Sequence, residues 1–157
     1  MTRRRLPALC ARLLSLFLAV VGAATVAGAQ NPSGIQIKDA WIRWLPGDIP
    51  AGGYLTLINH GDSPVRLVAV LSDDYGSISL HQSREEGGVS TMTPVQSITV
   101  KPHATLDLGA EGYHLMLSQP KKALHPGDYA VMTLKFGDGV QLPARFELRS
   151  PDMLMSK

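Results

Sequence analysis

The feature that most constrains the fold is an alternation of apolar and polar residues, repeated in short runs between residues 35 and 148. Such alternation is typical of β-strands with one buried face, because successive side chains of a strand point to opposite sides. Turn-forming residues separate the runs, for example at Pro126-Gly127-Asp128 and Gly137-Asp138-Gly139. The expected strands are 35–44, 53–58, 65–71, 77–81, 89–92, 97–100, 105–108, 113–117, 129–136 and 140–148. Many short strands at this spacing predict an all-β sandwich or barrel.

One of these strands, 129–136, gives the clearest prediction of a buried face. Its alternate residues Ala130, Met132, Leu134 and Phe136 are all apolar, whereas a threonine and a lysine stand among the residues between them. We therefore expect the apolar set to face the core. Met132 is then a packing residue rather than a ligand.

The first 29 residues have the organisation of an export signal. Arginines at 3–5 precede an apolar stretch at 13–26, and Ala27-Gly28-Ala29 follows as a small-residue cleavage site. We expect cleavage after Ala29 and a periplasmic mature chain that begins at Gln30. An uncleaved membrane anchor is the alternative, but the apolar stretch is shorter than the about 20 residues of a membrane span. General secretion and twin-arginine export both stay open.

The rest of the chain suits a single domain. We expect residues 30–150 to form it and residues 151–157 to form a flexible C-terminal tail. No run after the leader is long and apolar enough to span a bilayer. The mature protein is therefore expected not to cross the membrane.

The positive charge of the whole chain resides in the leader. The chain has 15 Lys and Arg against 13 Asp and Glu, and four of the arginines but no acidic residue lie in residues 1–29. Without the leader, the 11 remaining basic residues face 13 acidic ones, a net charge of −2. This balance excludes nucleic-acid binding through bulk positive charge.

The only cysteine, Cys10, also lies in the leader, so the mature chain has none. This excludes a disulfide framework, a thiol redox centre, a cysteine nucleophile, and metal sites that use thiolate, including blue copper. Cys10 is not expected to be a lipoprotein site either, because Leu9 precedes it where a small residue is required.

Two residues of the expected strand 113–117 could bind a metal. His114 and Met116 are two positions apart, so on a strand they point to one face, roughly 6.5–7 Å apart at the backbone. Both side chains are long enough to converge on one ion. We expect this face to be exposed to solvent.

A second His–Met pair is predicted across the hairpin of 77–81 and 89–92. A turn at Glu86-Gly87 places His81 directly opposite Met92, and a turn at Gly87-Gly88 makes the two residues diagonal neighbours on the same face. A three-residue loop would shift the register and send Met92 to the other face. The sequence does not decide which of these three turns the hairpin adopts.

Together the four side chains form a soft, neutral ligand set of two imidazoles and two thioethers. Thioethers favour Cu(I), whereas zinc prefers thiolate, imidazole and carboxylate, and calcium and magnesium prefer oxygen. The lack of cysteine fits, since thiols outside the cytoplasm are readily oxidised. We therefore predict a Cu(I) site made by His81, Met92, His114 and Met116.

At these residues the sequence resembles the periplasmic copper chaperones called PCuAC. That family carries a His, ten residues, a Met, twenty-one residues and then His-x-Met, and the intervals here match it without adjustment. Segments 39–43 and 53–59 also resemble the family, so the resemblance covers essentially the whole mature domain. One departure is Gln82, where many members have a second Met, so an optional ligand is missing.

The resemblance implies a cupredoxin-like Greek-key β-sandwich that binds Cu(I) near its surface. It further implies delivery of copper to the copper-bearing subunit of cytochrome c oxidase, alongside a thiol-bearing partner chaperone. We expect a monomer that transfers copper by ligand exchange. Extra thioethers from Met153 and Met155 are a weaker prospect than a frayed terminus.

Two other classes of function have less support in the sequence. An enzyme is not expected, because the chain lacks a Gly-x-Ser-x-Gly motif, a phosphate-binding glycine loop and a His-Glu-x-x-His motif. A metal-independent extracytoplasmic β-sandwich, acting as an interaction module, is the alternative; it requires the His–Met spacing to be coincidental. The remaining histidines, His60, His103 and His125, are expected to be solvated loop residues.

Overall fold

The structure is a computed structural model, and it describes residues 34–155 apart from residues 48, 110 and 111. The expected signal peptide and its cleavage after Ala29 lie outside the described residues. The part of the chain that the structure describes contains ten strands and one short helix: β1 Ile35–Arg43, β2 Ala51–Asn59, β3 Val65–Ser72, β4 Tyr75–Glu86, β5 Val89–Pro94, β6 Ile98–Val100, β7 Ala104–Leu108, β8 Tyr113–Pro120, β9 Tyr129–Phe136, β10 Gln141–Arg149 and α1 Pro151–Met155.

All ten expected strands are confirmed, although β4 is much longer than the predicted 77–81. The tail predicted at 151–157 contains α1, a helix of five residues. Its flexibility remains a prediction. Among the described residues, no helix is long and apolar enough to cross a membrane.

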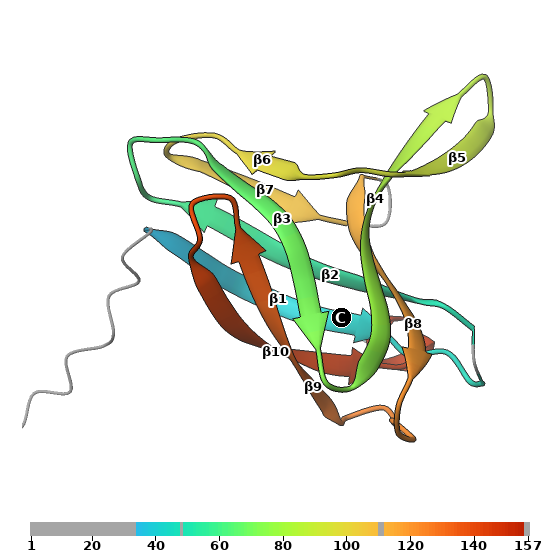
Figure 1. Cartoon of the computed structure of the whole chain (residues 1–157). Coiled ribbons are helices and arrows are strands. Elements are labelled where there is room, and N and C mark those ends of the chain that lie inside the picture. The colour runs from blue at the N-terminus through green and yellow to red at the C-terminus, as the bar shows by residue number, and fades with distance from the viewer. Residues whose placement is uncertain (1–33, 48, 110–111, 156–157) are drawn as a thin grey trace, which may run out of the picture.

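The strands join in the order β5-β4-β8-β2-β1-β10-β9-β3-β6, and β7 pairs with β2 beside this path. Figure 1 shows this sheet folding over, with β3 in contact with β4 in front of β1, β2 and β10. The pairs β1–β10 and β4–β8 join strands far apart in the chain, as in a Greek key. The expected cupredoxin-like Greek-key β-sandwich is confirmed.

The core forms between the two layers, from side chains at alternate positions of the strands. All four residues predicted for the inner face of β9, including Met132, are buried. They pack in the same core as Ile42, Leu57 and Phe146. The predicted role of Met132 as a packing residue is therefore confirmed.

A β-bulge changes the alternation within β1. Lys38 pairs with Thr56, but the next register pair is Trp41 with Tyr54, so β1 has one extra residue at this point. Asp39 adopts a positive φ of 47° there. As a result Ile35 faces the core before the bulge and Ile42 faces it after the bulge, although these positions differ in parity.

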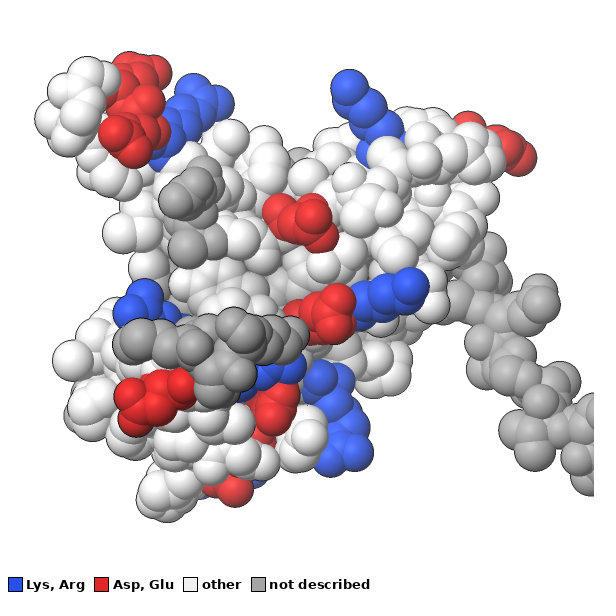
Figure 2. Space-filling model, turned by 180° about the vertical axis from the view of Figure 1, so that it is seen from behind, with Lys and Arg blue, Asp and Glu red and all other residues white. Residues whose placement is uncertain are grey.

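Charged side chains do not separate by sign over the face shown in Figure 2. Lys and Arg lie near Asp and Glu over most of that face. One ion pair of the protein joins Lys122 to Asp74, whose Nζ and Oδ1 atoms are 2.6 Å apart. Among the residues described on this face, no large region of one sign is presented to a strongly charged partner.

Candidate metal centre

Three of the four predicted ligands lie on the adjacent strands β4 and β8. His81 of β4 is the direct register partner of His114 of β8, and Met116 pairs with Ser79. Residues two apart on a strand and residues in register share a face. His81, His114 and Met116 therefore lie on one face, and the two imidazole rings are 5.8 Å apart between centroids.

The fourth predicted ligand, Met92, reaches the same face through the β4–β5 hairpin. The turn is at Gly87-Gly88, whose φ angles of 61° and 80° are those of a type I′ turn. In the resulting register Met92 pairs with Ser83, and His81 pairs with Pro94. Of the three turns that the sequence left open, the structure has the one that makes His81 and Met92 diagonal neighbours.

The expectation of a solvent-exposed face is wrong for His114. Its side chain is buried, with 4% exposure, and Met116 is half-buried. The His114 ring lies beside the His81 ring of β4 and contacts the Gly112 carbonyl, so neighbours outside the expected strand 113–117 help to bury it. Met92 differs, because it is 60% exposed on the edge strand β5. The predicted ligands thus range from the interior of the sheet to its edge.

Backbone contacts fix the orientation of the His114 ring. Its Nδ1 lies 3.3 Å from the carbonyl oxygen of Gly112, which can only accept a hydrogen bond. Nδ1 therefore carries the proton, and Nε2 presents a lone pair. A ring that donates one N–H to a backbone carbonyl and offers its other nitrogen is typical of histidines that bind metals.

The His81 ring is held differently. Its Nε2 lies 3.0 Å from the hydroxyl oxygen of Ser79. Its Nδ1 is buried and has no hydrogen-bond partner among the described residues. Burial, and to a smaller extent the adjacent His114, lowers the pKa of His81. The lowered pKa favours the neutral ring, which is the form that binds a metal.

Aromatic residues on the same face were not singled out from the sequence. Gly52 is the register partner of Met116, and the Tyr54 ring covers Gly52 so closely that a Cβ there would collide with the Tyr54 hydroxyl. Trp41 packs against Tyr54, with ring centroids 4.4 Å apart. The register of β2 with β8 is enough to place these aromatic residues near Met116. The sequence does not show that these two strands pair.

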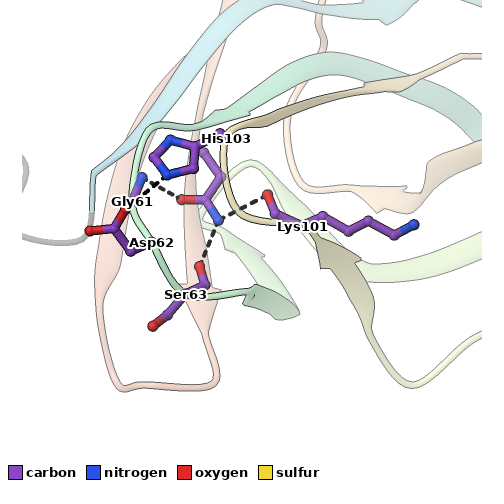
Figure 3. A network of polar contacts seen from close by, with 6 residues as sticks. Gly61, Asp62, Ser63, Lys101 and His103 are labelled. Atoms are coloured by element: carbon purple, nitrogen blue, oxygen red, sulfur yellow. Dashed lines mark hydrogen bonds and ion pairs between the residues drawn. The ribbon is translucent and has the colours of Figure 1, made fainter.

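The remaining histidines lie away from this face and are exposed, as predicted. His103 forms a 2.8 Å contact with Asp62, which Figure 3 shows at one corner of a polar network. The network centres on Asn59, whose amide donates to the carbonyl oxygens of Ser63 and Lys101. These contacts join the loop between β2 and β3 to the segment between β6 and β7, and they bring no further ligand to the candidate centre.

Comparisons with known proteins agree with this description. The family model described as "LpqE-like: Putative lipoprotein LpqE-like" matches residues 35–147. A putative lipoprotein of Leifsonia xyli, Lxx21020, is 30% identical over 122 residues, which are 74% of this chain and 73% of that protein. An uncharacterised protein of Rickettsia prowazekii, RP573, is 34% identical over 56% of this chain and 49% of its own length.

Solved structures with the same fold include copper-bound forms. The copper-bound PCuAC domain from PmoF2 has a TM-score of 0.64 and 26% identity, covering 75% of this chain and 94% of that domain. The Cu(I) form of DR1885 from Deinococcus radiodurans has a TM-score of 0.62 and 31% identity, covering 81% and 85%. The family resemblance seen in the sequence is therefore confirmed by structure.

Proposed function

The chain belongs to the LpqE-like family and has the PCuAC fold, and from that premise we propose that it is an extracytoplasmic Cu(I) carrier rather than an enzyme. The observation that carries the proposal is the register of β5, β4 and β8, which brings two imidazoles and two thioethers to one face. Copper-bound and Cu(I)-bound relatives support the choice of metal. The ligands are His81, Met92, His114 and Met116.

The gradient of exposure across the site suits transfer by ligand exchange. Met92 is exposed, so an incoming thiolate or imidazole can displace it first. His114 is buried and its ring is fixed by Gly112, so it releases the ion last. A Cu(I) ion held in this way is retained by the inner ligands while its outer coordination position exchanges.

The proposed compartment and acceptor follow from the leader and the family. We infer export to the periplasm, cleavage after Ala29, and delivery to the copper-bearing subunit of cytochrome c oxidase, alongside a thiol-bearing chaperone. The lipoprotein name of the family supports an extracytoplasmic location. Intact mass of the protein purified from periplasm tests the cleavage, and copper transfer from the loaded protein to the apo copper domain of the oxidase subunit tests the acceptor.

The metal-binding proposal is tested by an anaerobic Cu(I) titration against a chromophoric chelator. The wild-type protein is expected to compete for one equivalent, and His114→Ala is expected to lose at least about tenfold in affinity, which is ~1.4 kcal/mol. His125→Ala is the matched control, since His125 is exposed in a loop. Equal affinities of wild type and His114→Ala would show that Cu(I) binds elsewhere and contradict the assigned ligands, whereas a wild type that does not compete with the chelator would favour the metal-independent interaction module.

A further inference from the structure

We propose that His81 binds Cu(I) through Nδ1 and that the Ser79 hydroxyl is the positioning group that selects this nitrogen. The proposal rests on the proposed function, because it assumes that His81 is a Cu(I) ligand. It deepens that function by assigning the binding atom and a supporting residue that the family spacing does not include.

The geometry begins on β4, where Ser79 and His81 are two residues apart and therefore share a face. The Ser79 Oγ atom lies 3.0 Å from Nε2 of His81, which is hydrogen-bonding distance. In the next strand, Ser79 pairs with Met116 and His81 pairs with His114. The Ser79 hydroxyl thus lies among the proposed ligands, beside His81 on its own strand and opposite Met116 on the next.

The second observation concerns the other ring nitrogen of His81. Nδ1 is buried and has no hydrogen-bond partner among the described residues. An imidazole in contact with Ser79 has two neutral forms, with the proton on Nε2 or on Nδ1. A proton on Nδ1 would be a buried donor without an acceptor, which is unfavourable. A proton on Nε2 is accepted by Ser79 and leaves a lone pair on Nδ1 for the metal.

The two imidazoles of the centre would therefore bind through different atoms. His114 donates from Nδ1 to the Gly112 carbonyl and offers Nε2. In the proposed tautomer, His81 donates from Nε2 to Ser79 and offers Nδ1. In each ring the hydrogen bond fixes the nitrogen that is left for the metal, which is how groups around a metal site orient its ligands.

The test compares wild type with Ser79→Ala and Ser79→Thr, using full-length chains purified after expression. Long-range 1H–15N spectra of the imidazoles report which nitrogen of His81 carries the proton in the apo protein and which one shifts when Cu(I) is added. For wild type we expect a proton on Nε2 and a Cu(I)-induced shift of Nδ1. Ser79→Ala should show mixed tautomers and bind Cu(I) roughly tenfold more weakly, at the lower end of the usual effect of such supporting residues.

Ser79→Thr should restore both the spectrum and the affinity, because it retains the hydroxyl. Ser77→Ala is the matched control, as Ser77 lies on the same face of β4 but one pair further along, opposite Ser118. A Cu(I)-induced shift at Nε2, or wild-type spectra and affinity in Ser79→Ala, would overturn the assignment while leaving the carrier function intact. Wild-type protein that binds no Cu(I) would overturn both, and the titration of wild type with Cu(I) distinguishes these results.

Discussion

At the residue scale, three methionines of the strands occupy three different environments. Met132 is fully buried in the core, Met116 is half-buried on β8, and Met92 is 60% exposed on β5. Leucine has nearly the volume of methionine but no sulfur, so it separates packing from ligation. The three positions therefore form a natural comparison series.

Replacement of each methionine by leucine is expected to separate the three roles. Met132→Leu should change the free energy of unfolding by less than about 1.5 kcal/mol and leave Cu(I) affinity unchanged. Met116→Leu and Met92→Leu should fold normally and weaken Cu(I) binding by about tenfold or more, ~1.4 kcal/mol each. Urea unfolding and chelator competition measure the two effects. Weaker Cu(I) binding in Met132→Leu alone would contradict the assignment.

Asn59 provides a prediction about stability rather than binding. Its side chain is fully buried; the amide donates to the carbonyls of Ser63, Val100 and Lys101, and Oδ1 accepts from the Gly61 N–H. Asn59→Ala leaves several of these backbone groups unsatisfied, so we expect a loss of about 3 kcal/mol in the free energy of unfolding. Urea denaturation measures it.

Asp62→Ala is the control for this change. Asp62 lies in the loop that directly follows Asn59, and the substitution removes its exposed contact with His103. The urea midpoint of this variant should stay close to that of wild type. Cu(I) affinity of folded Asn59→Ala should also match wild type, since Asn59 contacts none of the proposed ligands. A stable Asn59→Ala protein would show that the buried amide network contributes little.

At the scale of elements, the β4–β5 hairpin decides whether Met92 can take part in the site. β8 pairs with β4 only as far as Gln82, and β5 is an edge strand. Figure 1 shows the hairpin projecting beyond the rest of the sheet. The position of Met92 therefore depends on the turn at Gly87-Gly88 and on the pairing of β5 with β4 alone.

Insertion of one glycine between Gly87 and Gly88 is expected to disconnect Met92 from the site. Because two-residue turns match the twist of the flanking strands, the extra residue is expected to enter a strand, which shifts the register by one and turns Met92 to the opposite face. Cu(I) affinity, measured by chelator competition, should fall to that of Met92→Leu, and combining the two changes should cause no further loss. Gly88→Asn, which keeps the loop length and suits a positive φ, is the matched control. Additive losses in the combined variant would contradict this reading of the hairpin.

At the scale of the whole molecule, the site joins segments that are distant in the chain. β4 and β8 are neighbours in the sheet although β5, β6 and β7 lie between them in the sequence. Those three strands pair with β4, β3 and β2, respectively, and so leave one edge of β4 free to pair with β8. An ion shared by these strands cross-links the sheet. Because such a site does not exist in the unfolded chain, Cu(I) binding should stabilise the fold.

Thermal unfolding under anaerobic conditions is expected to show this coupling. With free Cu(I) at 100 times its Kd, binding adds about 2.7 kcal/mol to the stability of the folded state. Each kcal/mol raises the Tm of a small domain by about 4–8 °C. His114→Ala should show little of the rise and His125→Ala all of it. An equal rise in His114→Ala would indicate that Cu(I) binds elsewhere.

The sequence by itself determined the strands and the identity of the candidate ligands. Alternation and turn residues are local signals, so they located all ten strands. Strand geometry then indicated that each His–Met pair could share one face. The length of β4 and the bulge at Asp39 were not predicted, because both depend on a partner strand as well as on the chain itself. The choice among three turns likewise required the pairing of β5 with β4.

Only the tertiary structure decided how accessible each ligand is and what surrounds it. His114 is buried by neighbours that include the His81 ring of another strand, and no pattern within 113–117 contains that information. The contact of Ser79 with His81 and the cover of Tyr54 over Gly52 also arise on strands brought together by pairing. Side-chain alternation depends on neighbours along the chain, whereas burial and hydrogen bonding depend on neighbours across the sheet, which are distant in sequence.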